Sequence, residues 1–378
     1  MATHILIVDD EANDLDHVRR AFEALGAVDL KHPQQVVPED LAEASLVLVD
    51  YEMRHWDERF EQTTASMQPQ NGVALAAIYR SFAKERFNRP MAVALYSGRL
   101  SELSKIPSET RPHVLASLTS LEWVFPKVAD DSASPEDDTA RLAERATWLA
   151  EAAEALPNAW PEEFDAVRAQ VEELLDSPQD PDLSETCWKA VSRCHPPMFE
   201  MSSSSHGIWF LDWLLHDILP YPTFLFDRMS LAAALQLAPT GVDALIAADS
   251  AIAEQLRQAE YTGILSRFDG QRWWGPMVNA LITRVRGDDR ETNLGVLFAA
   301  GVGGVDVYPG DDPVVCYDAK LAKLPDLYER REAIEIRPDL WPVFARPAHA
   351  PRTLCEDAAI AALAKRAGAA TIVPYVES

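Results

Sequence analysis

Four short apolar stretches of the sequence each run into a side chain that a phosphoryl site could use. Their aliphatic, mainly β-branched residues are typical of strands buried on both faces of a parallel sheet. The groups that follow them are the carboxyl groups of Asp9 and Asp10 after residues 5–8, the carboxyl group of Asp50 after residues 46–49, the hydroxyl of Ser97 after residues 92–96 and the amine of Lys127 after residues 123–126. Ligands of open α/β sheets bind beyond the carboxyl ends of the strands, so we expect these five side chains to share one edge.

Helical segments separate these strands, as a doubly wound sheet requires. An amphipathic pattern predicts a helix over residues 13–25, and further helices are expected over 38–44 and 72–87, with a short strand at 28–30. This alternation of strands and helices favours a parallel sheet with right-handed crossovers. The first third of the chain is therefore predicted to be an α/β domain with five parallel strands.

The order of these polar groups resembles the motif set of the receiver domain of two-component response regulators. The motifs are the acidic pair Asp9-Asp10, the Asp-x-x-Met sequence from Asp50 to Met53, the pair Ser97-Gly98, and an aromatic residue, Phe125, two positions before Lys127. The resemblance covers about the first 130 residues and implies the flavodoxin-like fold of that family.

The resemblance also implies a metal site and a phosphorylation site. Three crowded carboxylates repel one another unless a hard divalent cation neutralises them, and oxygen donors suit Mg²⁺. On this interpretation Asp10 and Asp50 bind Mg²⁺ directly, Asp9 does so through water, and the backbone carbonyl of Glu52 completes the protein's share. Asp50 would accept a phosphoryl group from a histidine kinase or phosphotransfer protein. The alternative is that the acids only cap the loops and helices that follow them.

The family also implies the roles of the remaining residues. Lys127 would pair with the phosphoryl oxygens as a compact charge. Ser97 would donate a hydrogen bond to the same group, and Phe125 would turn inward as Ser97 moves, which makes these two residues the expected switch.

Two features depart from the family pattern. Residues 55–70 form an insertion after the Asp-x-x-Met motif, and we expect it to be either a lid or docking segment or a surface excursion without a role. Pro126 precedes Lys127, whereas the family places a proline after the lysine. The reach of Lys127 into the site is expected to persist, while the geometry of its loop is left open.

The length of 378 residues predicts two domains. We expect a receiver domain over residues 1–156, which ends in a connector helix at about 134–156, and a mostly α-helical output domain over 157–378. The helix start is predicted from Ser134, Pro135 and the acids that follow.

Charge and composition narrow the class of protein. The net charge is −26, of which −7 falls on residues 1–130 and −19 on the remainder. Such an acidic balance disfavours nucleic acid as a partner, because phosphate neutralisation needs clustered Lys and Arg. The chain lacks a bilayer-spanning apolar run and an opening signal sequence, and its four scattered cysteines do not form a disulfide framework. These observations predict a cytoplasmic protein that does not bind a membrane.

The C-terminal part resembles no family, but it offers candidate sites. Cys187, Cys194 and His195 with His206 could be zinc ligands, although their spacing favours core thiols. A second candidate is the segment with Trp209, Asp212, Trp213, His216 and Asp217, where a packed helix is the simpler interpretation. Helices are predicted over 161–175, 184–194, 208–219, 240–261, 276–286 and 356–365.

Three functions stay open at this point. The protein is expected to be a phosphorelay response regulator whose C-terminal domain binds a protein partner or a second copy of the chain, without further enzymatic activity beyond phosphoryl transfer to Asp50 and its slow hydrolysis. The alternatives are a phosphate sink that drains a kinase, and a response regulator with an enzymatic output domain. The absence of a catalytic motif in the sequence favours binding.

Overall fold

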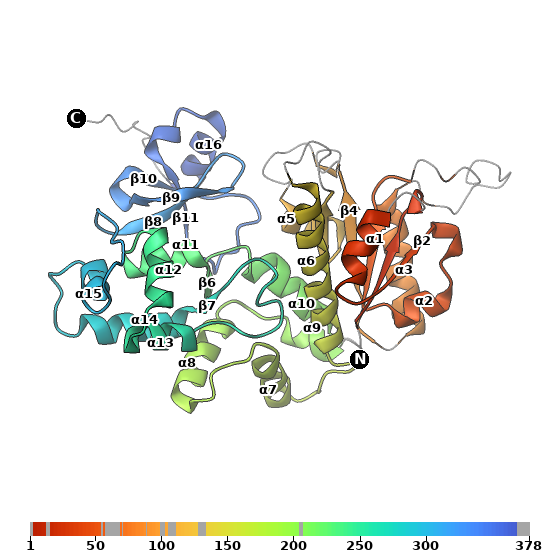
Figure 1. The fold of residues 1–378 in the computed structure, drawn as a ribbon, viewed down its shortest axis with the longest axis horizontal. Coiled ribbons are helices and arrows are strands. Elements are labelled where there is room, and N and C mark those ends of the chain that lie inside the picture. Colours follow the sequence, from red (N-terminus) through yellow and green to blue (C-terminus); the bar gives the residue numbers. More distant parts are fainter. Residues whose placement is uncertain are drawn as a thin grey trace. The chain divides into compact units, whose positions relative to one another are not determined.

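The computed structural model describes residues 3–12, 16–53, 56, 69, 71–87, 89–98, 103–104, 111–127, 134–203 and 207–368 (Figure 1). Apart from Trp56 and Pro69, the insertion expected over residues 55–70 lies outside the described residues. The chain divides into two compact units. The first comprises Met1–Leu175, Pro196–Pro220 and Gly263–Asp269, and the second comprises Asp176–His195, Tyr221–Thr262 and Gly270–Ser378. The domain boundary expected after residue 156 stays a prediction.

The first unit is built on a five-stranded parallel sheet with the strand order β2-β1-β3-β4-β5. This is the doubly wound, flavodoxin-like order, so the predicted fold class is confirmed. The strands are β1 (His4–Val8), β2 (Ala27–Lys31), β3 (Leu46–Asp50), β4 (Ala92–Ser97) and β5 (Trp123–Pro126). The three central strands are almost entirely buried because helices cover both faces.

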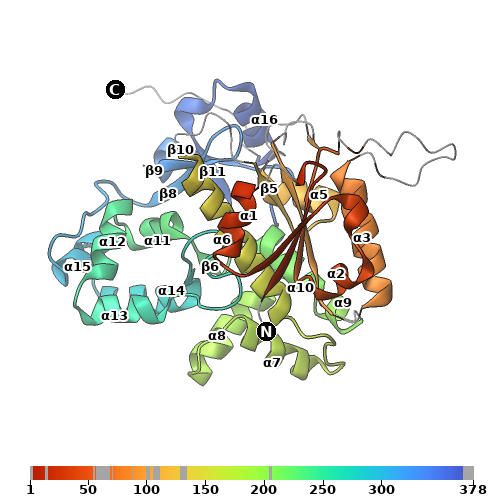
Figure 2. The ribbon, with the colours of Figure 1, turned by 45° about the vertical axis from the view of Figure 1, so that its right-hand side comes forward.

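The helices of the first unit form two layers on the sheet. On one face α2 (Pro38–Glu43), α3 (Gly72–Arg86) and α5 (Pro112–Thr119) share a hydrophobic core with the sheet. On the other face α6 (Pro135–Ala155) packs against α1 (Asp16–Glu23) and the central strands (Figure 2). The expected connector helix is therefore a packed helix of the sheet. The other helical elements of this unit are η2 (Pro33–Gln35), α7 (Phe164–Leu174), α9 (Met198–Ser203), α10 (Ile208–Trp213) and the π-helical turn η5 (Leu214–Ile218).

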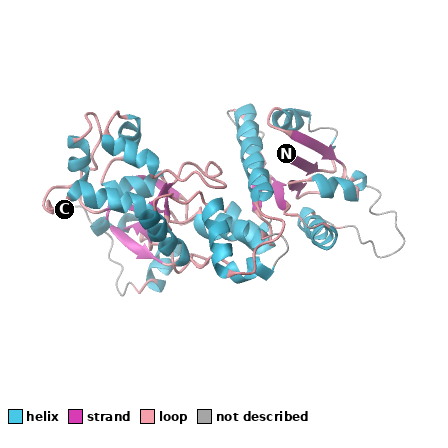
Figure 3. Cartoon of the chain, turned by 90° about the horizontal axis from the view of Figure 1, so that it is seen from below, coloured by secondary structure: helices cyan, strands magenta, loops and turns pink. Residues whose placement is uncertain are grey.

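The second unit is mostly helical, but it also contains a sheet that the sequence reasoning did not predict (Figure 3). Its helices are α8 (Pro181–Ser192), α11 (Arg228–Leu235), α12 (Pro239–Ala247), α13 (Ala251–Gln258), α14 (Gly275–Arg286), α15 (Leu294–Ala300) and α16 (Ala358–Arg366), with the short turns η6 (Arg330–Glu332) and η7 (Arg352–Leu354). Four strands pair in the order β10-β11-β8-β9, and a two-stranded sheet joins β6 (Leu225–Phe226) to β7 (Trp273–Trp274). The four strands are β8 (Pro313–Tyr317), β9 (Lys323–Glu329), β10 (Ala333–Ile336) and β11 (Ala348–Pro351).

One predicted helix of the second unit is wrong in its extent. The single helix expected over residues 240–261 is broken into α12 and α13. Ser250 ends the break, because its hydroxyl accepts a hydrogen bond of 3.1 Å from the Ala253 amide and caps a new helix. The sequence signal for this break is a serine that can cap a helix. It lies within a segment whose apolar residues keep their helical spacing throughout.

Candidate functional site

Three aspartates meet at the carboxyl edge of the parallel sheet. Asp50 is the last residue of β3, and Asp9 and Asp10 follow β1, which pairs with β3 through Val8 and Val49. One carboxylate oxygen from each of the three lies within 4.8 Å of the other two. Asp9 and Asp50 are buried, with 2% and 5% of their surface exposed, and Asp10 is half-buried. This group of oxygen donors could hold a metal ion, and hard divalent cations prefer such donors.

Lys127 reaches this cluster from the end of β5. Its Nζ lies 2.9 Å from Asp50 Oδ1 and 3.6 Å from Asp9 Oδ2, both within ion-pairing distance. The Lys127 amide donates a hydrogen bond of 2.9 Å to the Ser97 carbonyl, which extends the pairing of β4 with β5 by one residue. With Pro126 before it, the lysine therefore still points at Asp50.

Burial and mutual repulsion raise the pKa values of the two buried aspartates. Burial, followed by the charge of Asp9, raises the pKa of Asp50 to about 6, although Lys127 opposes both effects. Burial also raises the pKa of Asp9, again against the influence of Lys127. Burial acts to lower the pKa of Lys127, but the carboxylates of Asp50 and Asp9 outweigh it and raise that pKa above its usual value. The single positive charge of Lys127 thus partly offsets the negative charges of two buried carboxylates.

Two buried oxygens of the cluster lack directed hydrogen bonds. Among the described residues no donor makes a hydrogen bond of acceptable geometry to Asp9 Oδ2 or Asp50 Oδ1, so the short Lys127 contact with Asp50 Oδ1 acts as an ion pair. The other oxygen of Asp9 accepts a bond of 2.7 Å from the Glu11 amide. Unsatisfied buried carboxylate oxygens are costly, and a cation in this cluster would satisfy them. The donor set therefore fits a divalent cation.

The chain returns to this edge after the insertion through Asn71 and Gly72. The Gly72 amide donates a hydrogen bond of 2.9 Å to the Tyr51 carbonyl, and Asn71 Oδ1 caps α3 by accepting one of 3.1 Å from the Ala74 amide. A Cβ atom at Gly72 would stand only 1.9 Å from the Asp50 carbonyl oxygen. Only glycine permits this approach, so the helix start is held beside Asp50 despite the extra residues.

The two expected switch residues lie on neighbouring strands. Ser97 is the last residue of β4 and is buried, with 1% exposed, while Phe125 on β5 pairs in register with Tyr96. The Tyr96 ring also faces Lys127, whose Nζ lies 5.0 Å from the ring centroid. The sequence reasoning missed Tyr96, although its place beside Ser97 on a strand that leads to the site was a usable signal. The roles of Ser97, Phe125 and the Glu52 carbonyl stay predictions.

Phe125 packs against a segment that lies far away in the sequence. Its ring makes an edge contact with Phe268 at 6.3 Å, and Trp123 meets the same phenylalanine at 4.8 Å. The Arg145 guanidinium of α6 lies 4.8 Å from the Phe268 centroid and donates a hydrogen bond of 3.0 Å to the Phe268 carbonyl. The expected switch aromatic is therefore enclosed by a cluster of Trp123, Arg145 and Phe268, which we call the Phe268 cluster.

The candidate residues Asp212 and His216 meet Glu122, just before β5. His216 Nε2 lies 3.0 Å from the Glu122 carbonyl oxygen, and since a carbonyl only accepts, the imidazole is the donor. Burial lowers the pKa of His216 to about 4, and burial followed by the neighbouring Glu122 raises the pKa of Asp212. The imidazole is thus uncharged at neutral pH, and the Asp212 carboxyl ionises less readily than an exposed one. This arrangement favours a packed helix, because a neutral histidine committed to a backbone carbonyl is a poor base.

The cysteines do not form a metal site in the part of the chain that the structure describes. Cys187 and Cys194 are buried thiols, and burial raises the pKa of Cys187 to about 12 and of Cys194 to about 11. The possible fourth ligand, His206, lies outside the described residues. Within the described ranges, the acid, cysteine and histidine side chains that lie close enough together to hold a metal ion are those of Asp9, Asp10 and Asp50. Among the described residues no helix is long and apolar enough to cross a membrane.

Comparison with solved structures finds a likeness to a response regulator. A structure of the response regulator RcsB from Salmonella typhimurium, described for its conformational dynamism in DNA interaction, matches this chain with 13% sequence identity and a TM-score of 0.25. The match covers 56% of this chain and 98% of that one. No family model matches the sequence, and no curated protein matches it. A TM-score of 0.25 is too low to bear on function, which therefore has to be argued from the side chains.

Proposed function

We propose that residues 1–156 are a response-regulator receiver domain in which Asp50 accepts a phosphoryl group from a histidine kinase or a phosphotransfer protein. The observation that carries the proposal is the contact of 2.9 Å between Lys127 Nζ and Asp50 Oδ1 inside the cluster with Asp9 and Asp10. These four groups come from three strand ends of a sheet with the order 2-1-3-4-5, where ligands of this fold bind.

Asp50 acts as the nucleophile. One carboxylate oxygen forms a bond to phosphorus, while the bond between phosphorus and the donor's imidazole nitrogen breaks and its electron pair stays on that nitrogen. A pKa of about 6 leaves the carboxylate mostly ionised at neutral pH, as a nucleophile must be. Lys127, already 2.9 Å away, then shifts its ion pair to the phosphoryl oxygens and stabilises their charge.

Asp9, Asp10 and Asp50 would hold Mg²⁺, with the backbone carbonyl of Glu52 as a further ligand. When bound, the cation neutralises charge on the carboxylates and on the phosphoryl oxygens. Asp9 Oδ2 and Asp50 Oδ1 support this assignment, because these buried oxygens accept no hydrogen bond of acceptable geometry and share the single charge of Lys127, so a divalent cation would complete their neutralisation.

Ser97 and Phe125 would report the phosphorylated state. Ser97 donates to the phosphoryl group, and Phe125 adjusts its packing in response. Because Phe125 touches Phe268, this adjustment strains or relaxes the Phe268 cluster, which ties residues 263–269 to the state of Asp50. The switch thus ends on a segment that follows the receiver by more than a hundred residues.

The C-terminal domain, residues 157–378, acts through binding a protein partner or a second copy of the chain. Its acidic charge supports this over DNA binding. A phosphate sink without output is the second candidate. The third, an enzymatic output, loses support because the buried imidazole of His216 is neutral and donates its hydrogen bond to the Glu122 carbonyl.

Mass spectrometry of the intact protein after incubation with acetyl phosphate tests the receiver assignment. We expect one added phosphoryl group in the presence of Mg²⁺, and none in EDTA or in Asp50→Ala. Equal phosphorylation of Asp50→Ala would refute the assignment of Asp50. Affinity capture of partners with phosphorylated and unphosphorylated protein then separates a binding output, which changes with phosphorylation, from a phosphate sink, which does not.

A further inference from the structure

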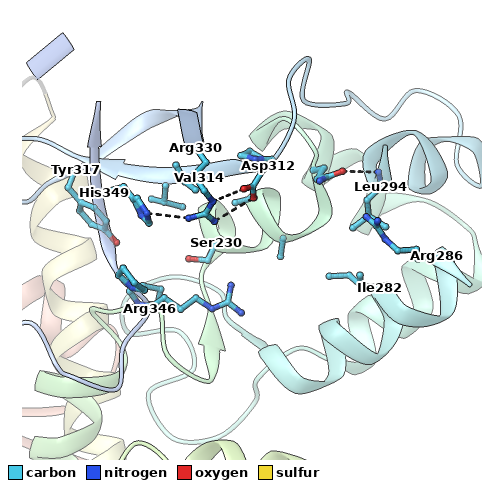
Figure 4. Close-up of a pocket in the computed structure, with 17 residues that line it drawn as sticks. Ser230, Ile282, Arg286, Leu294, Asp312, Val314, Tyr317, Arg330, Arg346 and His349 are labelled. Carbon is cyan, nitrogen blue, oxygen red and sulfur yellow. Dashed lines mark hydrogen bonds and ion pairs between the residues drawn. The ribbon is translucent and has the colours of Figure 1, made fainter. Parts of the chain in front are cut away.

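The second unit contains a cavity of about 420 Å³ that the receiver chemistry does not use (Figure 4). It lies among α11, α14, β8 and the residues before β11, and its size suits a small organic ligand. Aliphatic side chains form much of its wall. They are Ala233, Ala234, Ile282, Leu294, Val314 and Val315. The cavity can therefore bury an apolar body.

Three arginines from separate elements line the same cavity. Arg286 ends α14, Arg330 begins η6, and Arg346 precedes β11; Figure 4 shows them spaced around the cavity. Among the described lining residues the only acid is Asp312. In a chain with a net charge of −26, three guanidinium groups around one cavity with one acid form an unusual positive site.

Arg330 is held in place by its neighbours. Its Nε lies 2.6 Å from Asp312 Oδ2, and its Nη1 lies 3.3 Å from His349 Nε2. Arginine can only donate, so His349 accepts through Nε2 and is neutral, in keeping with its lowered pKa, which follows from burial and from the charge of Arg330. Asp312 therefore neutralises Arg330 and is not available to Arg346, whereas the carboxylate of Asp289 lies close enough to Arg286 for their charges to interact.

Arg346 and Arg286 form no ion pair with a carboxylate of the described chain. The Arg346 guanidinium lies over the Phe226 ring, 4.3 Å from its centroid, and its backbone is fixed by a hydrogen bond of 3.0 Å from its amide to the Pro222 carbonyl. Arg346 also lines a neighbouring hollow with Lys189 and Arg193, whose described lining contains no acid. A guanidinium stacked on an aromatic ring keeps its donor edges for a planar oxyanion.

We propose that this cavity binds a small organic anion, a phosphate or carboxylate on a largely apolar body, with the oxyanion held by Arg346. Arg330 and His349 shape the wall beside it. The apolar side chains supply affinity for the body of the ligand, so a bare inorganic anion binds weakly. Such a site would make the second unit a sensor of a metabolite as well as an output domain.

Calorimetric titration of the full-length protein with matched probes tests this proposal. The phosphate arm compares AMP with adenosine and with inorganic phosphate, and the carboxylate arm compares hexanoate with hexanol. We expect AMP or hexanoate to bind, which also identifies the anion, and the neutral counterparts and inorganic phosphate to bind at least tenfold more weakly.

Variants assign the binding to the cavity. Because a hydrogen bond to a charged group is worth tenfold or more in affinity, Arg346→Gln should weaken the binding of the probe by about tenfold or more. Arg284→Gln, an exposed arginine of helix α14 that does not line the cavity, is the matched control and should bind normally. Circular dichroism checks the fold of each variant. The proposal is overturned when no probe binds, when neutral and anionic probes bind equally, or when the folded Arg346→Gln variant binds like the wild type.

Discussion

Replacement of Asp50 by Asn should make the metal-free protein more stable at neutral pH. The pKa of Asp50 is raised from the ordinary value of 3.8 to about 6, chiefly by burial. A difference of this size corresponds to about 3 kcal/mol of free energy of unfolding. The folded state holds this proton more tightly than the unfolded state does, so the stability that the neutral carboxyl contributes is complete below the unfolded pKa and is lost as the pH rises through about 6. The side-chain amide of the Asp50→Asn variant is uncharged at every pH, so the variant does not lose this stability.

The assay is urea denaturation of the wild type and Asp50→Asn in EDTA at pH 4 and pH 7.5. We expect the two proteins to be equally stable at pH 4, and the variant to exceed the wild type by up to about 3 kcal/mol at pH 7.5. Added Mg²⁺ should offset most of this difference, because a cation bound to the native state at one hundred times its dissociation constant stabilises it by about 2.7 kcal/mol. Glu144→Gln, which removes an exposed carboxylate from α6, should follow the wild type throughout.

Two results would refute this reasoning. In the first, Asp50→Asn is no more stable than the wild type at pH 7.5 in EDTA, which would mean that the cluster does not strain the fold. In the second, Mg²⁺ stabilises the wild type and the variant alike, which would place any bound cation elsewhere.

Three further predictions follow from other contacts. Lys127→Gln should slow phosphorylation by acetyl phosphate about tenfold or more, measured by intact mass, because the ion pair of 2.9 Å is lost. The exposed Lys84→Gln should react at the wild-type rate. A Lys127→Gln variant that reacts as fast as the wild type would show that Lys127 does not assist the reaction. Phe268→Ala should lower the free energy of unfolding by about 3 to 5 kcal/mol, since it empties the space between Trp123, Phe125 and Arg145, whereas the exposed Arg267→Ala should change it little; a loss below 1 kcal/mol would contradict the packing. Asp212→Asn should stabilise the protein more at pH 8 than at pH 4, because burial and then Glu122 raise the pKa of Asp212, so that the wild type loses stability as the pH rises above the unfolded pKa. The exposed Asp165→Asn is the control, and a variant less stable than the wild type at pH 8 would contradict the raised pKa.

The parallel sheet and the polar ends of its strands could be predicted because both signals are local. An apolar run followed by Asp50 fixes a buried strand and the group at its end, and the same holds for Asp9, Ser97 and Lys127. The topology of the sheet then brings these ends to one edge. The sequence shows a glycine, Gly72, directly after the insertion. Only the structure shows why a glycine is needed there, because α3 approaches the Asp50 carbonyl closely at this residue.

The remaining features depend on contacts between distant parts of the chain. Nothing near Phe268 in the sequence indicates that it packs on Phe125, and nothing near Arg346 indicates that it shares a cavity with Arg286. The short strands β8 to β11 were missed for a related reason. They contain no long apolar run, and their pairing partners lie up to 33 residues away, as for His349 and Cys316 (349 − 316). Short strands whose partners lie this far along the chain show little apolar periodicity of their own, so sequence patterns do not predict them.

The identity of the phosphorylated residue is the most direct test of the central claim. Borohydride reduction converts an aspartyl phosphate into homoserine, so reduction after reaction with acetyl phosphate and Mg²⁺, followed by peptide sequencing, marks the acceptor. The account predicts homoserine at position 50 and unchanged aspartate at positions 9 and 10. Homoserine at position 9 or 10, or at none of the three in a protein that carries a phosphoryl group, would contradict it.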